Sequence, residues 1–97
     1  MAEIINNAGN QFSISGDLGF VSVPDLLGKS IALFDDVAKA EIDLKDARAL
    51  DSSAVALLVE WTRQFEMKGG EIVFSNVPDQ FLRIAQISDV DSVLKFS

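Results

Sequence analysis

Residues 50–70 read LDSSAVALLVEWTRQFEMKGG, and this stretch decides the fold. It opens with Asp51-Ser52-Ser53, residue types that favour a helix start, and it closes with Gly69-Gly70, where helices commonly stop. Between these ends, apolar residues recur at the spacing of one helix face. Placed at about 100° intervals, the positions separate into an apolar face and an outward face: Ala54, Leu58, Trp61 and Phe65 form the first, and Ala56, Glu60, Arg63 and Met67 the second.

The remaining elements follow from alternation and from turn residues. Strands are predicted at residues 3–7, 11–15, 40–44 and 71–75, and the first two form a hairpin around residues 8–10. The strand at 40–44 is expected to end at the polar step Lys45-Asp46. A third helix is predicted after residues 76–78, and the apolar tail 89–96 is expected to dock back on the body. The third helix carries Phe81, Leu82, Ile84 and Ala85, with Ile87 as a further candidate.

The first helix is predicted from Ser22 to about residue 37. Ser22 offers an N-cap, and Pro24 fits the first turn, where a missing N–H costs nothing. Gly28 inside the helix is expected to allow a close approach to the sheet. An apolar stripe is expected to face the core: Val23, Leu26, Leu27, Ile31, Phe34 and Val37.

The predicted element order is β-β-α-β-α-β-α. Helices alternating with strands imply parallel crossovers, and the opening hairpin adds one antiparallel pair. We therefore expect an α/β fold with a mixed, mostly parallel sheet, formed by residues 1–97 as one domain. A hydrophobic share of 48% suffices for a core and is not typical of disorder.

Charge and composition exclude several classes of function. The net charge of −7 argues against nucleic acid and against anionic membrane surfaces as direct ligands, and it permits a basic protein partner. The chain has neither cysteine nor histidine, which removes disulfides, the commonest zinc ligands and the Ser-His-Asp and Cys-His mechanisms. We expect no metal, no cofactor and no enzymatic activity.

Two motifs that suggest chemistry are incomplete. Gly28-Lys29-Ser30 matches the end of a phosphate-binding loop, but the glycine needed five positions earlier is Val23. The acidic clusters Asp35-Asp36 and Asp89-Val90-Asp91 do not follow the spacing of a calcium loop. We interpret these acidic clusters as solvated loop ends.

Nothing in the sequence predicts membrane insertion or export. Residues 1–9 lack the basic and apolar regions of a signal peptide, and the longest apolar run, 54–59, is far shorter than a membrane span. A soluble cytoplasmic protein is expected.

The central segment resembles the signature of STAS domains, the sulfate-transporter and anti-sigma-factor-antagonist modules. The resemblance covers Ile42-Asp43-Leu44, residues 50–58 and the earlier Ile14-Ser15-Gly16-Asp17-Leu18. Two positions depart from the family pattern: Ala54 stands at a usual glycine, and Gly19 stands where an acidic residue or asparagine often occurs. The second departure weakens any transfer of the kinase-facing surface of the anti-sigma antagonists.

The C-terminal third, residues 69–78 followed by Leu82, Ile84-Ala85 and residues 90–94, is similar to the MlaB-type branch of the family. That resemblance implies a non-catalytic subunit of a bacterial phospholipid transporter, which binds an ABC ATPase (MlaF) beside a permease (MlaE). Its location would be peripheral to the inner membrane, through the partner.

The start of the central helix is the candidate site. An N-terminal serine can cap the helix, accept a phosphoryl group or face a partner. The resemblance implies that Ser52 contacts the ATPase, or, in an anti-sigma antagonist, that Ser52 or Ser53 is phosphorylated. The predicted partner-binding residues are Ser52, Ser53, Ala56, Glu60 and Arg63.

Overall fold

The computed structural model describes residues 2–97 and confirms the predicted α/β fold and element order. The sheet has the order β1-β2-β3-β4, in which β1 and β2 are antiparallel and the other two pairs are parallel. The elements are β1 (Glu3–Ala8), β2 (Gln11–Leu18), α1 (Val23–Leu33), β3 (Lys39–Ala49), α2 (Ser53–Met67), β4 (Glu71–Ser75) and α3 (Asp79–Ile87).

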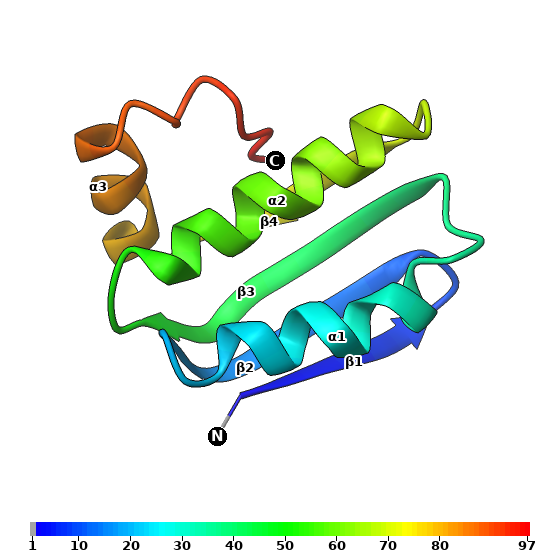
Figure 1. Ribbon diagram of the computed structural model, residues 1–97, viewed down its shortest axis with the longest axis horizontal. Helices are drawn as coiled ribbons and strands as arrows, with labels where there is room; N and C mark the ends of the chain where they lie inside the picture. The colour runs from blue at the N-terminus through cyan, green and yellow to red at the C-terminus, as the bar shows by residue number, and fades with distance from the viewer. Residues whose placement is uncertain (1) are drawn as a thin grey trace.

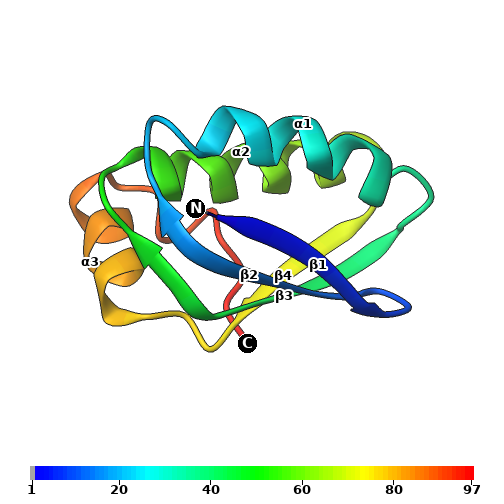
Figure 2. The ribbon, with the colours of Figure 1, turned by 90° about the horizontal axis from the view of Figure 1, so that it is seen from below.

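Helices α1 and α2 lie side by side on one face of the sheet, as Figures 1 and 2 show. Both follow strands that point the same way, so both helices begin at the same end of the molecule. The strands turn alternate apolar residues toward these helices, as expected for a sheet that buries one face. The fully buried strand residues include Phe12, Ile14, Ile42, Leu44 and Phe74.

Strand β3 is longer than predicted, because the chain forms a β-bulge at the polar residues Lys45 and Asp46 and pairing with β2 continues after it. Ser13 pairs with Asp43 and Ser15 with Asp46, so β3 has one more residue than β2 between these pairs. The extra residue reverses the alternation: Leu44 faces the core before the bulge and Ala47 after it. The prediction that the strand ends at residues 45–46 was therefore wrong.

Helix α1 ends at Leu33, earlier than predicted, and turns a different face to the core. Ile31 is 70% exposed, whereas Ser30 is buried. The Ser30 hydroxyl accepts a hydrogen bond from the Trp61 indole (2.9 Å) and donates to the Leu27 carbonyl (2.8 Å). A buried tryptophan N–H requires an acceptor, so Ser30 takes the inward position that the apolar stripe assigned to Ile31.

The prediction that Gly28 allows α1 to approach the sheet closely is also wrong. A Cβ added to Gly28 would meet no atom within 4 Å, so the glycine faces open space and not the sheet. Ser22 occupies the N-cap position, but its hydroxyl accepts from the Gly19 amide and donates to the Asp17 carbonyl, and caps no helical N–H.

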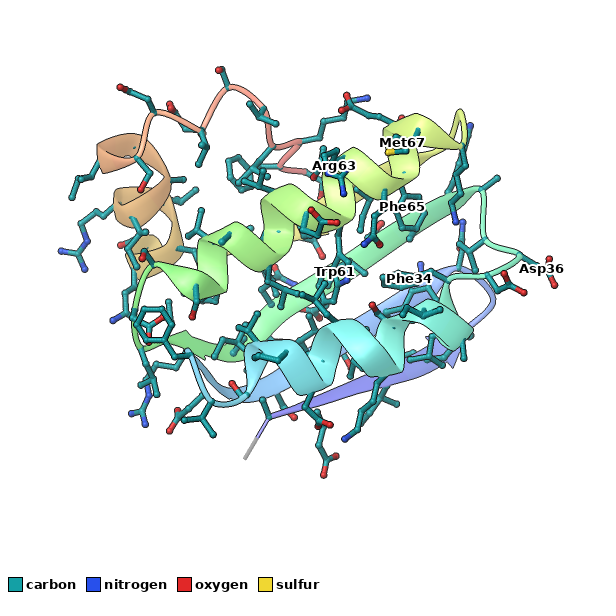
Figure 3. The ribbon with its side chains drawn as sticks, viewed as in Figure 1. Phe34, Asp36, Trp61, Arg63, Phe65 and Met67 are labelled. Atoms are coloured by element: carbon teal, nitrogen blue, oxygen red, sulfur yellow. The ribbon has the colours of Figure 1, made fainter. Side chains whose placement is uncertain are left out.

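An aromatic cluster joins α1, α2 and the sheet. Phe34 makes edge contacts with Phe12, Trp61 and Phe65, at centroid distances of 5.0, 5.5 and 5.2 Å. Figure 3 shows Phe34, Trp61 and Phe65 between the two helices. Trp61 is completely buried, which confirms the apolar face predicted for the central helix.

Helix α3 lies at one end of the molecule (Figure 1). The tail reaches the edge of the sheet at β4, where Phe96 forms a bridge with Phe74. Phe81 and Ala85 are buried, whereas Ile87 is 84% exposed and is not part of the core. The tail docks on the body as predicted: Leu94 is buried, and the Phe74 amide donates to the Lys95 carbonyl at 2.9 Å.

Candidate partner-binding site at the start of helix α2

Asp51, and not a serine, caps the start of α2. Its carboxylate accepts hydrogen bonds from the amides of Ser53 (2.9 Å) and Phe20 (3.2 Å) and from the Ser53 hydroxyl. The bond from the Ser53 amide satisfies one of the N–H groups that a helix start leaves unpaired. The carboxylate also complements the positive end of the helix dipole.

The two serines therefore differ. Ser52 occupies the N-cap position and is exposed, and among residues 2–97 its side chain caps no amide. Ser53 is half-buried, and its hydroxyl is held by Asp51. Of the two hydroxyls, that of Ser52 is the one available to a partner or a modifying enzyme.

The charge on Asp51 is expected to contribute to stability. Hydrogen bonds from the Ser53 hydroxyl, and from the amides of Ser53 and Phe20, hold the pKa of Asp51 below its usual value. A lowered folded-state pKa adds stability above the unfolded carboxyl pKa of about 3.9, and that stability is lost as pH falls through the folded value. Asp51→Asn should therefore lower Tm at pH 7, and the difference from the unsubstituted chain should shrink below pH 4. Thermal unfolding at a series of pH values measures this, and a constant difference would contradict it.

Downstream of the serines, α2 presents a ridge of small and polar residues. Ala56 and Arg63 are exposed, and Glu60 is half-buried. The Arg63 guanidinium binds the Glu60 carboxylate at 3.1 and 2.7 Å, which lowers the pKa of Glu60 and raises that of Arg63. Figure 3 shows Arg63 on the side of α2 turned away from α1. The structure thus places all five predicted site residues on the accessible part of one helix, while their role stays a prediction.

Two hollows flank this ridge, and sequence reasoning found neither. One, of about 460 Å³, lies against α1 and includes Gly28, Ile31 and Ser53 in its lining. The other, of about 310 Å³, lies against the end of α3 and includes Ser52 and Val90. Ala56 and Glu60 line both hollows. The only signal in the sequence concerns the first hollow. Gly28 precedes Ile31 by one helical turn, and a residue without a side chain leaves space beside the apolar side chain of Ile31.

The described residues offer binding surfaces but no metal centre. Across residues 2–97, no three His, Cys, Asp or Glu side chains are grouped so that they could hold a metal ion. In the same range, no helix is long and apolar enough to cross a membrane. The chemistry that the site supports is hydrogen bonding by Ser52 and burial of apolar surface on either side of Ala56.

Comparison with known proteins gives concordant results. Residues 4–95 match the family model described as "Mlab, STAS domain". The anti-sigma-B factor antagonist of Bacillus subtilis (strain 168) is 25% identical over 87 residues, which are 90% of this chain and 80% of that protein.

Among solved structures, a chain of the Acinetobacter MlaFEDB complex in an ATP-bound conformation has a TM-score of 0.81 and 26% identity, with 98% of this chain and 99% of that chain covered. The unphosphorylated anti-sigma factor antagonist SpoIIAA, with a TM-score of 0.75, 20% identity and coverage of 100% and 88%, shares the fold. Because the family model spans nearly the whole chain, the protein belongs to the STAS domain family, in the group described as Mlab.

Proposed function

We propose that this chain is a non-catalytic subunit that binds and supports the ABC ATPase of a bacterial phospholipid transport system of the Mla type. The family match and the similarity to a chain of the MlaFEDB complex support this assignment. The observation that carries it is the exposed start of α2, where the free Ser52 side chain and Ala56 form a small-residue ridge between two apolar hollows.

This surface has the properties of an interface centre. The centres of protein–protein interfaces contain few charged residues, and a partner must be able to approach them closely. Ser52 and Ala56 are small, and the basic side chain on α2, that of Arg63, is already paired with Glu60. Apolar side chains of the ATPase would fill the two hollows, and a hydrogen-bonding group would meet the Ser52 hydroxyl. The chain would then lie at the inner membrane through the ATPase and its permease.

An affinity purification of the tagged chain from its native host tests this assignment. Bound proteins are identified by mass spectrometry, and we expect an ABC ATPase together with its permease. A serine kinase or a sigma-factor regulator in their place would contradict the transport assignment.

The second candidate function is that of an anti-sigma factor antagonist switched by phosphorylation. The relative from Bacillus subtilis favours it, and so does the exposed Ser52 hydroxyl. A phosphate would add a charge of about −1.5 to −2 directly beside Asp51 and so release an acidic partner.

Under this alternative, a cognate serine kinase and ATP should phosphorylate Ser52 and leave Ser53 unmodified, because Asp51 holds the Ser53 hydroxyl. Mass spectrometry locates the phosphate. Ser52→Ala should abolish the modification, and Ser53→Ala should preserve it. Absence of phosphate from both positions would count strongly against this function.

A further inference from the structure

Three apolar side chains stand in solvent beside the start of α2. Phe20 is 73% exposed, Val21 95% and Leu50 58%. Phe20 and Val21 lie in the loop between β2 and α1, and Leu50 lies in the link between β3 and α2. Both connections are at the same end of the molecule in Figures 1 and 2. The three residues line one shallow hollow of about 350 Å³, and together they are called the apolar knob below.

The backbone of the knob is held in place by hydrogen bonds. The Phe20 amide donates to Asp51, and the Leu50 amide donates to the Leu18 carbonyl at 2.8 Å. A Cβ at Gly19 would lie 2.9 Å from the bonded Asp51 carboxylate and 3.3 Å from the Leu50 Cβ, so glycine allows the two loops to touch. A surface held in one conformation loses little entropy on binding, and exposed aromatic side chains are frequent interface anchors.

The charges around the knob indicate its occupant. Two carboxylates, those of Asp17 and Asp51, line the same hollow, and Arg48, two residues before Leu50, is paired with Asp17 at 2.8 Å. Both carboxylates carry a negative charge at neutral pH, as aspartates ordinarily do. With a net charge of −7, the chain would repel a second copy of itself and an anionic membrane surface. The fitting occupant is a protein pocket that is apolar inside and carries Lys or Arg at its rim.

We propose that the apolar knob inserts into such a pocket on the same ATPase that contacts Ser52. This inference rests on the proposed function. Asp51 makes the two surfaces continuous, since it binds the Phe20 amide, follows Leu50 and precedes Ser52. The knob supplies apolar anchoring, and the ridge on α2 supplies close approach and a hydrogen bond.

The test measures binding of purified cognate ATPase by calorimetry. The variant carrying Phe20→Ser and Val21→Ser should bind about 30-fold more weakly or worse, the loss typical of an interface anchor. Leu50→Ser, in the other connection, should also weaken binding. Ile5→Ser, which removes a half-exposed apolar side chain on β1, should bind with unchanged affinity. Each variant should unfold at a temperature close to that of the unsubstituted chain, because the removed side chains are largely solvated.

The outcomes separate this inference from the function on which it rests. Wild-type affinity of both knob variants, with binding abolished by Ser52→Arg, would overturn the knob and leave the proposed function standing. An unsubstituted chain that does not bind the ATPase would overturn both. Two further measurements cover the other occupants: flotation with vesicles of phosphatidylethanolamine and phosphatidylglycerol, and self-association in sedimentation. If the knob variants lost vesicle binding but kept their affinity for the ATPase, the occupant would be a membrane. If they lost self-association but kept that affinity, the occupant would be a second copy of the chain.

Discussion

Replacing Ser52 with arginine is expected to abolish binding of the ATPase, with an affinity loss of about 100-fold or more, while the domain stays folded. Ser52 is exposed and its side chain caps no amide, so folding does not depend on it. Asp51 supplies the cap of α2 in either case. The long arginine side chain would cover Ala56 and enter the hollow against α3, which prevents close approach of the partner.

Calorimetry with the purified ATPase measures this effect, and two variants serve as controls. Asn6→Arg makes the same change in charge on the exposed strand β1, away from α2, and should bind normally. Ser52→Ala removes only the hydroxyl and should weaken binding much less than Ser52→Arg. Full affinity of a folded Ser52→Arg variant would show that the proposed interface is wrong.

Trp61→Ala is expected to have the largest effect on stability, a loss of about 3–5 kcal/mol in the free energy of unfolding. Trp61 is completely buried, packs edge-on against Phe34 and donates its indole N–H to Ser30. The substitution leaves a large cavity between α1 and α2. A domain of this size has about 5–15 kcal/mol in total, so much of its stability would be lost.

Urea unfolding followed by circular dichroism measures this loss. Trp61→Phe is the matched variant, because it keeps an aromatic ring beside Phe34 and removes the hydrogen bond to Ser30. We expect it to cost about 1–2 kcal/mol, in the range of a lost buried hydrogen bond. An unfolding midpoint of Trp61→Ala equal to that of the unsubstituted chain would contradict the central place of the aromatic cluster.

The sequence alone determined the element order, both faces of α2 and the bounds of β4. These features depend on local periodicity: apolar residues recur at helical spacing through Trp61 and Phe65, and turn residues bracket residues 71–75. The same reasoning brought Ser52, Ser53, Ala56, Glu60 and Arg63 together as candidates, because they share one helix. Their role in binding a partner stays a prediction.

Only the tertiary structure decided which residues depart from these local patterns. The bulge in β3 depends on pairing with β2, and the inward turn of Ser30 depends on an indole thirty-one residues away. The hydrogen bond from the Phe20 amide to Asp51, the hollows beside Ala56 and the apolar knob each combine segments that are distant in the chain. Periodicity reports which face of an element is apolar. It does not report which distant group will satisfy a buried donor or leave a surface uncovered, and those contacts form only when the chain has folded.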